Sequence, residues 1–237
     1  MTAAILGWTS LSETPRVLIK EYSFGGGKAT ALAVQLPARA WLIISPPKHI
    51  SPAEVSGFEE AGGVLALVAN NGAHYLGLGP WSRAFPSACT YAAPRAAARI
   101  RKKTPDAGKL EPVEALTGSL GDNVALLAMD GDKIGDLLLR VRSERGTILY
   151  VSDMVANIPE LPRNPVVRLI FKWSNSAPGL KLFTLFFTFF VSDAKAARAF
   201  LARELRADPP AVLVPAHGDV VVRPDITSLL VKMLGSA

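Results

Sequence analysis

Two histidines and one aspartate each follow a predicted strand, and they are the residues best suited to chemistry. His74 follows the apolar run 64–68, Asp153 follows 147–152 and His217 follows 211–214. Two imidazoles and one carboxylate suit zinc, iron or manganese, and three protein ligands leave a position free for water. The pattern predicts a site for one divalent metal, with Asn71 orienting water or substrate.

Each of these residues also has an ordinary structural interpretation. His74 would hydrogen-bond the backbone of its loop, Asp153 would cap a following helix, and His217 would hold a tight turn with Gly218. A metal needs all three side chains together, and sequence spacing does not show that they converge. A protein without any metal is therefore an equal alternative, and no residue is assigned a catalytic role.

Other residues near the predicted site have more than one interpretation. Tyr75 and Trp81 are candidates for lining a substrate pocket, although packing is the commoner fate of aromatic side chains. Cys89 lies in a predicted strand and is expected to be a small core residue. The aspartates at 130, 132 and 136 lack calcium-loop spacing and are expected to mark turns, and His49 is expected at the surface.

Composition limits the partners. The chain has 237 residues, a net charge of +6 and one cysteine, which excludes an intrachain disulfide and a multi-cysteine metal site. The basic run 99–103 lacks interleaved aromatics, so we predict no nucleic-acid binding. An unknown small molecule is the expected ligand, and a homo-oligomer is an open alternative.

No segment predicts targeting or a membrane span. Residues 1–16 lack the features of a signal peptide, so a cytoplasmic location is expected. The apolar segment 179–191 is too short to span a bilayer and contains Lys181. This segment is expected to be a buried helix or an interface, with an in-plane membrane anchor as the alternative. Its Phe-rich part, residues 183–190, is expected to cover the active-site face or to form a dimer interface. A peripheral membrane or assembly module thus remains a further functional hypothesis.

The elements that must position the site are readable from patterning. Strands are predicted at 17–24, 29–36, 40–47, 64–68, 88–92, 124–129, 136–142, 147–152 and 211–214. Helices are predicted at 51–62, with Ser51 as the N-cap, at 193–206, and from Pro224 to Leu234. No linker separates these elements, so one domain, 1–237, is expected.

The strand-end residues resemble the metallo-β-lactamase fold, a four-layer αββα sandwich of the α+β class, over residues 29–222. That family carries HxHxDH after a strand, then a further histidine, a bridging aspartate and a final histidine. The stretch Ala69-Asn70-Asn71-Gly72-Ala73-His74 is similar to the first motif but keeps only its last histidine. LYVSDMVAN resembles the segment with the bridging aspartate, and PAHGD resembles the segment with the final histidine. HYLGLGPW, FPSA and YAAP also resemble a divergent branch of this fold.

The departures from the family pattern imply a reduced site. Residues 69 and 71 are alanine and asparagine, and the intermediate histidine has no counterpart, so the resemblance implies that the first metal position is lost. Residue 73, a ligand position of the second metal, is alanine. His74, Asp153 and His217 match three ligands of the second position. The resemblance therefore implies a degenerate metallo-hydrolase without a dinuclear site, with a mononuclear metal-dependent hydrolase as the alternative.

Overall fold

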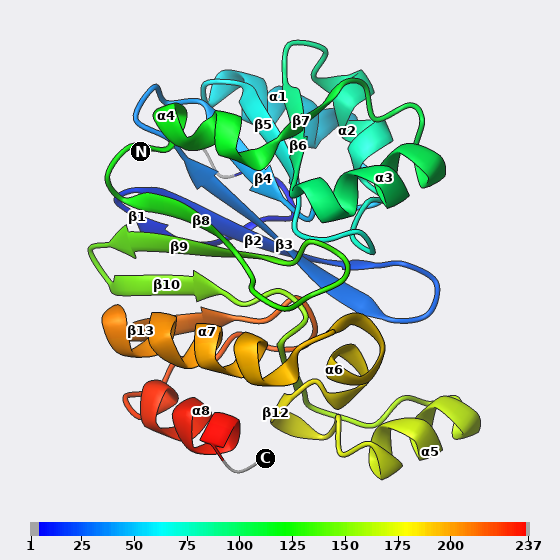
Figure 1. Cartoon of the computed structure of the whole chain (residues 1–237). Coiled ribbons are helices and arrows are strands. Elements are labelled where there is room, and N and C mark those ends of the chain that lie inside the picture. The colour runs from blue at the N-terminus through cyan, green and yellow to red at the C-terminus, as the bar shows by residue number, and fades with distance from the viewer. Residues whose placement is uncertain (1–4, 236–237) are drawn as a thin grey trace.

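A computed structural model describes residues 5–235 and arranges them in four layers, with two sheets packed face to face between two groups of helices (Figure 1). The larger sheet has the strand order β1-β2-β3-β4-β5-β6-β7, and the smaller has the order β13-β10-β9-β8. Strands β11 and β12 form a separate two-stranded ladder. Helices α1, α2 and α3 cover the larger sheet, whereas α7 and α8 cover the smaller one (Figure 1).

The strands are β1 (Thr9–Glu13), β2 (Arg16–Ser23), β3 (Lys28–Gln35), β4 (Trp41–Ile44), β5 (Val64–Ala69), β6 (Cys89–Ala92), β7 (Leu110–Pro112), β8 (Val124–Ala128), β9 (Leu137–Ser143), β10 (Gly146–Tyr150), β11 (Val155–Ile158), β12 (Gly179–Leu182) and β13 (Pro210–Val214). The helices are α1 (Pro52–Glu60), α2 (Leu78–Ala84), α3 (Pro94–Lys103), the 3-10 helix η1 (Val113–Leu116), α4 (Thr117–Leu120), α5 (Pro165–Trp173), α6 (Thr184–Phe190), α7 (Ala194–Ala207) and α8 (Ile226–Gly235).

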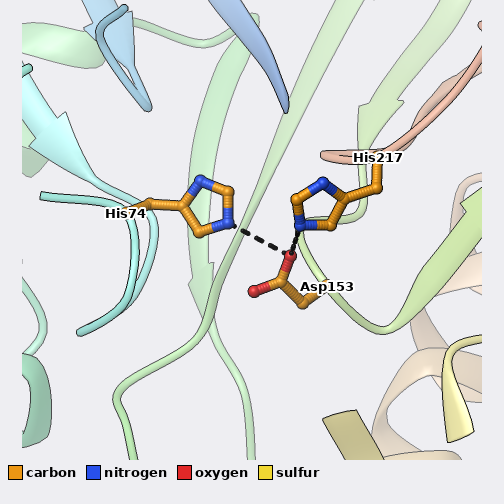
Figure 2. Close-up of side chains that lie close together, drawn as sticks. All are labelled: His74, Asp153 and His217. Carbon is orange, nitrogen blue, oxygen red and sulfur yellow. Dashed lines mark hydrogen bonds and ion pairs between the residues drawn. The ribbon is translucent and has the colours of Figure 1, made fainter. Parts of the chain in front are cut away.

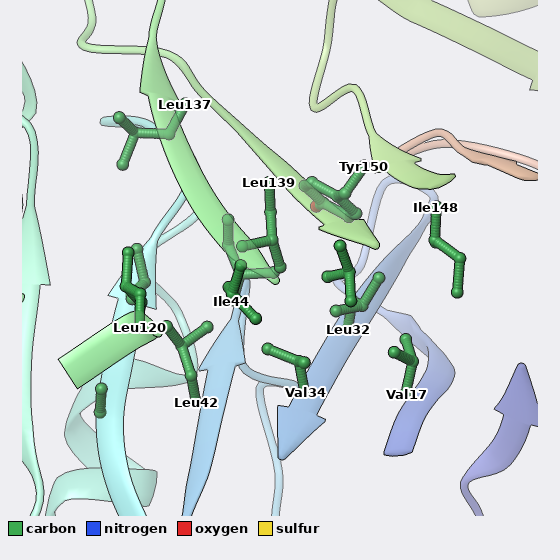
Figure 3. Close-up of a cluster of buried hydrophobic side chains, with 14 of the residues drawn as sticks. Val17, Leu32, Val34, Leu42, Ile44, Leu120, Leu137, Leu139, Ile148 and Tyr150 are labelled. Atoms are coloured by element: carbon green, nitrogen blue, oxygen red, sulfur yellow. The ribbon is translucent and has the colours of Figure 1, made fainter. Parts of the chain in front are cut away.

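Buried apolar side chains form three clusters between these layers. The central cluster fills the space between the two sheets and includes Leu32, Leu42, Leu139 and Ile148 (Figure 3). A second cluster joins the larger sheet to its helices, and a third joins the smaller sheet to α6, α7 and α8. Burial on both faces of the central strands is what makes them continuous apolar runs in the sequence.

Alternate side chains of strand β3 belong to two different clusters. Leu32 and Val34 belong to the cluster between the sheets, whereas Ala31 and Ala33 belong to the cluster on the helical side. Successive side chains of a strand point to opposite faces, so this single strand contributes to two clusters.

Local signals predicted several element boundaries. Ser51 caps α1, and the Glu54 carboxylate accepts a hydrogen bond from the Ser51 backbone N–H in a capping box. Asp193 caps α7 by accepting a hydrogen bond from the backbone of Ala196. The predicted strands 136–142 and 147–152 correspond to β9 and β10, which pair as an antiparallel hairpin.

Two expectations about side chains and segments were wrong. Cys89 is exposed rather than a core residue, and it is the first residue of the short strand β6. The apolar segment 179–191 is not one buried helix: β12 ends at Leu182, α6 follows, and only Phe186 and Phe187 of that helix are buried. Helix α5 and the ladder β11–β12 were not predicted at all.

Within the described residues, no helix is long and apolar enough to cross a membrane.

Candidate functional site

The site lies where strands of both sheets end. Strand β5 runs parallel to β4, and β13 runs parallel to β10, so the loops after these strands emerge at the same edge of each sheet. The loop after β5 carries His74, the turn after β10 carries Asp153, and the turn after β13 carries His217. Loops at the carboxyl ends of strands are where such folds gather functional side chains.

The three side chains converge on one point (Figure 2). The Asp153 Oδ1 atom lies 3.2 Å from His74 Nε2 and 3.1 Å from His217 Nε2. One ligand atom from each residue lies within 4.8 Å of the others. Tetrahedral zinc with ligands at about 2.0–2.1 Å would separate neighbouring ligand atoms by roughly 3.3 Å. The two measured separations therefore fit three ligands of a single ion.

The far nitrogen of each imidazole is held by a neighbour. His217 Nδ1 donates to the carbonyl oxygen of Lys28 at 2.7 Å, which fixes the tautomer whose Nε2 has a free lone pair. His74 Nδ1 lies 2.8 Å from Ser45 Oγ, which is in turn 3.0 Å from the Tyr22 hydroxyl. Such outer partners orient metal-binding histidines and raise their basicity.

Asn71 holds the aspartate from beneath the site. Its Nδ2 donates to Asp153 Oδ2 at 2.8 Å and to Asp136 Oδ1 at 2.8 Å, while its Oδ1 accepts from the backbone of Ala73. The amide is completely buried. Asn71 thus positions a candidate ligand and does not face the cavity, which differs from the expectation that it orients water or substrate.

The electrostatics of the cluster favour ion pairs. Burial alone would raise the pKa of Asp153, but the facing imidazoles of His74 and His217 hold it well below its usual range. Burial would lower the pKa of His217, but its hydrogen bond to Asp153 and the charge of that carboxylate raise it. Asp153 is therefore a carboxylate at neutral pH.

Asp136 is a member of the site that sequence reasoning assigned to a turn. It is fully buried, and its Oδ1 accepts from Asn71 and, at 2.6 Å, from the Ser152 hydroxyl. Its Oδ2 has no hydrogen-bond partner. Burial and the charge of nearby Asp153 raise the pKa of Asp136 well above its ordinary value. Asp132 does mark a turn, because its Oδ1 accepts backbone hydrogen bonds from residues 134–136.

Two serines next to the site occupy the left-handed backbone region. Ser45, directly after β4, has a φ of 54°, and Ser152, just after β10, has a φ of 49°. Residues other than glycine adopt this conformation at a cost, and such residues cluster at functional sites. A serine after an apolar strand was the only sequence signal for either residue.

Replacing Ser45 with alanine is expected to weaken metal binding by about 10- to 100-fold, because the His74 ring loses the partner that orients it. The free energy of unfolding should change much less than metal affinity. Competition with a chromogenic chelator measures the dissociation constant, and unchanged affinity would show that Ser45 does not orient the ligand.

Replacing Asp136 with asparagine is expected to flatten the dependence of folding stability on pH. The raised pKa means that the folded protein keeps a proton that the unfolded chain loses above about pH 4. The unfolded state then binds fewer protons, so the free energy of unfolding of the wild type falls as pH rises from there towards the folded pKa. Asparagine cannot ionise and removes this slope.

Chemical denaturation across a pH series tests this expectation. Asp122→Asn, at an exposed position, is the matched control and should keep the wild-type slope. An unchanged slope in Asp136→Asn would mean that Asp136 is ionised in the folded protein.

A cavity of about 820 Å³ opens over the three candidate ligands. Apart from His74, Asp153 and His217, its wall is mainly apolar, with side chains from the β2–β3 region and from α5 and α6: Tyr22, Phe24, Ile170, Trp173, Phe183, Phe186, Phe189 and Phe190. Burial raises the pKa of Tyr22 to about 12, so its hydroxyl stays protonated. The site therefore combines a small polar floor with a large apolar wall.

The structure does not bring Tyr75 or Trp81 to this cavity. Trp81 is completely buried, and its Nε1 donates to the carbonyl oxygen of Pro47 at 2.9 Å. Tyr75 packs against the cluster between the larger sheet and its helices. His49 is exposed, as expected.

The structural roles that the sequence also predicted for Asp153, His217 and His74 are found for only some of these residues. Asp153 caps no helix, because strand β11 follows it. His217 does precede a tight turn: Gly218 has a φ of 93°, and an added Cβ would lie 2.0 Å from the carbonyl oxygen of Asn157. His74 Nδ1 and Nε2 both face side chains, Ser45 and Asp153, rather than the backbone.

Solved structures similar to this chain share one architecture. A metallo-β-lactamase from Pontibacter korlensis is 13% identical, with 97% of this chain and 99% of that chain covered and a TM-score of 0.57. The metallo-β-lactamase FIM-1 from Pseudomonas aeruginosa in its mono-zinc form is 11% identical, with 99% and 97% covered and a TM-score of 0.56. The metal-soaked Flv1 flavodiiron core from Synechocystis sp. PCC6803 is 13% identical, with 96% and 60% covered and a TM-score of 0.54.

The sequence matches no family model and no curated protein. At identities this low, the structural likeness establishes the fold and not the activity. The matched length and the four-layer arrangement of mixed sheets and helices agree with the architecture that the sequence resemblance implied. The chain has the metallo-β-lactamase fold, with a His/Asp/His cluster at the strand ends.

Proposed function

We propose that the chain binds one divalent metal through His74, Asp153 and His217 and acts as a mononuclear metal-dependent hydrolase. The observation that carries this proposal is the convergence of three ligand atoms within 4.8 Å at the floor of the cavity. Two imidazoles and one carboxylate suit zinc, iron or manganese. The mono-zinc form of the similar FIM-1 structure supports a single-ion site as a workable arrangement on this fold.

A dinuclear site is not part of this proposal. Within residues 5–235, His74, Asp153 and His217 form the identified cluster of metal-type ligands. The motif positions that would hold a further ion, residues 69 and 71, carry alanine and asparagine. The Asn71 Oδ1 atom, through which an asparagine would ligate a metal, accepts a hydrogen bond from the Ala73 backbone, while Nδ2 donates to two carboxylates.

In this mechanism each residue has a defined task. A bound divalent metal would lower the pKa of water and make hydroxide available near neutral pH. Asn71 keeps the Asp153 carboxylate turned so that Oδ1 faces the imidazoles. Tyr22 lines the cavity, and its hydroxyl, which stays protonated, would donate to a developing negative charge on the substrate. The apolar wall excludes bulk water and favours a substrate with an apolar group.

The test combines metal content with hydrolysis. Protein purified without a chelator or a histidine tag should contain about one zinc, iron or manganese ion per chain by mass spectrometry. It should hydrolyse p-nitrophenyl esters, and a chelator should abolish the activity until metal is restored. Metal without hydrolysis would overturn the enzymatic part alone, and no metal after zinc, iron and manganese are each added would overturn both parts.

One observation favours a second candidate, a degenerate protein that binds a ligand without metal or catalysis. Asp153 Oδ1 lies at hydrogen-bond distance from both imidazoles, so the cluster satisfies itself once an imidazole carries a proton. The raised pKa of His217 supports that state. This candidate predicts a metal-free protein whose cavity retains an apolar small molecule through purification, which native mass spectrometry would detect.

A further inference from the structure

Helix α5 carries an exposed apolar stripe that no other part of the described chain covers. Val166, Leu169, Ile170 and Trp173 have exposed fractions of 66%, 68%, 45% and 88%. Their spacing places all four on one helix face. Monomeric soluble proteins rarely leave such a continuous apolar stripe exposed, so this stripe marks a contact surface.

The opposite side of α5 attaches the helix to the domain. The Phe171 ring packs 5.8 Å from the Phe183 ring, and no residue of α5 is fully buried. Figure 1 shows α5 projecting from the lower edge of the molecule, beyond α6 and β12. The helix is therefore held in place with its apolar stripe turned towards solvent.

The stripe continues into the wall of the cavity. Ile170 and Trp173 of α5 and the exposed Phe189 of α6 all line the cavity whose floor holds the three candidate ligands. A partner bound to this stripe would therefore lie at the cavity mouth.

Charge around the stripe selects the kind of partner. Residues 160–190 contain four basic side chains, Arg163, Arg168, Lys172 and Lys181, and one acidic side chain, Glu160. Among the described residues, Arg163, Arg168 and Lys172 are exposed and take part in none of the ion pairs. A symmetric contact with a second copy would bring these like charges together. An anionic surface would neutralise them.

We infer that α5 docks this protein on an anionic lipid surface, with Trp173 at the interface and the cavity mouth facing the lipid. An apolar stripe bordered by arginine and lysine and ending in tryptophan is the pattern of a helix that lies in the plane of a membrane interface. The helix has nine residues, too few to span a bilayer. The docking uses none of the candidate metal ligands, so it stands or falls independently of the proposed hydrolase.

Trp173 provides an intrinsic probe. Of the four tryptophans, Trp8, Trp41 and Trp81 are 8% exposed or less, whereas Trp173 is 88% exposed. Mixing the protein with phosphatidylcholine vesicles that contain phosphatidylserine should shift tryptophan emission to shorter wavelength, and brominated lipid should quench it. Trp173→Phe should still sediment with these vesicles but lose the spectral shift.

Sedimentation with matched variants tests the surface directly. Val166→Ser/Leu169→Ser removes two exposed side chains that do not line the cavity and should lower the vesicle partition constant at least about tenfold. Leu6→Ser/Val222→Ser, at sites of similar exposure outside α5 (68% and 63%), should bind like the wild type.

A second pair of variants tests the contribution of the basic side chains to vesicle binding. Arg168→Gln/Lys172→Gln should lower the partition constant by about tenfold or more, whereas Lys102→Gln/Lys103→Gln on α3 should not. High salt and vesicles of phosphatidylcholine alone should both weaken binding.

Three results would overturn this inference: no sedimentation with phosphatidylserine vesicles, equal loss in the control variants, or a stable dimer by light scattering that Val166→Ser/Leu169→Ser dissociates. The metal assay separates the two proposals, because His74→Ala/His217→Ala should still sediment with vesicles.

Discussion

Replacing His74 and His217 together with alanine is expected to reduce bound metal from about one equivalent per chain to none and to abolish hydrolysis. Both imidazoles face the same carboxylate oxygen, so the double variant leaves Asp153 as the only ligand of the cluster. A single carboxylate does not hold zinc, iron or manganese at the concentrations left after dialysis. Metal content by mass spectrometry, before and after zinc addition, measures the loss.

The control for this experiment is His49→Ala. His49 is the remaining histidine of the chain and is exposed, so its replacement removes an imidazole without touching the cluster. Loss of both imidazoles also leaves the buried Asp153 charge unpaired, which lowers stability. Circular dichroism must therefore show that the double variant is folded. A folded double variant that keeps its metal would refute the assigned ligand set.

Replacing Gly218 with alanine is expected to lower the free energy of unfolding by about 3 kcal/mol and to disrupt the position of His217. An alanine Cβ at this position would lie 2.0 Å from the carbonyl oxygen of Asn157, so the backbone of β11 or of the turn must move. The same turn is fixed by hydrogen bonds from the Asn157 backbone to His217 and from Asp219 to Asn157. Movement there carries His217 away from Asp153.

Gly25→Ala separates the cost of placing alanine at a positive φ from the cost of its contact with Asn157. Gly25 has nearly the same φ, 91° against 93°, but an added Cβ there meets nothing within 4 Å. It reports the cost of a left-handed alanine alone, about 1–2 kcal/mol. Thermal or urea unfolding of both variants, with metal content, makes the comparison. Equal destabilisation by the two substitutions would show that the contact with Asn157 does not constrain the turn.

Sequence patterning predicted the elements that build the sheets, because their residues respond to a simple environment. Strands such as β3 and β4 are buried on both faces and therefore read as apolar runs. Ser51 and Asp193 cap their helices through contacts with residues only a few positions away. Such short-range rules need no knowledge of the fold.

The secondary structure of residues 155–190 was not predicted from the sequence, because it depends on residues that are distant along the chain. Strand β11 pairs with β12, although α5 lies between them in the sequence. The exposed face of α5 is apolar, a pattern that would ordinarily indicate burial. Likewise, the sequence did not decide the environments of Cys89 and Trp81. The cysteine is exposed, while the tryptophan is buried with its Nε1 bonded to Pro47.

The sequence alone determined which side chains were available for chemistry: two histidines and an aspartate after strands, with alanine or asparagine where further ligands of the family motif would stand. Only the tertiary structure decided that residues 74, 153 and 217 meet, since their contacts join loops from two different sheets. It also added Ser45, Asp136 and Ser152, which support the cluster through hydrogen bonds from remote strand ends. The physical reason is that side-chain identity is local, whereas the distance between two loops depends on the packing of the entire core.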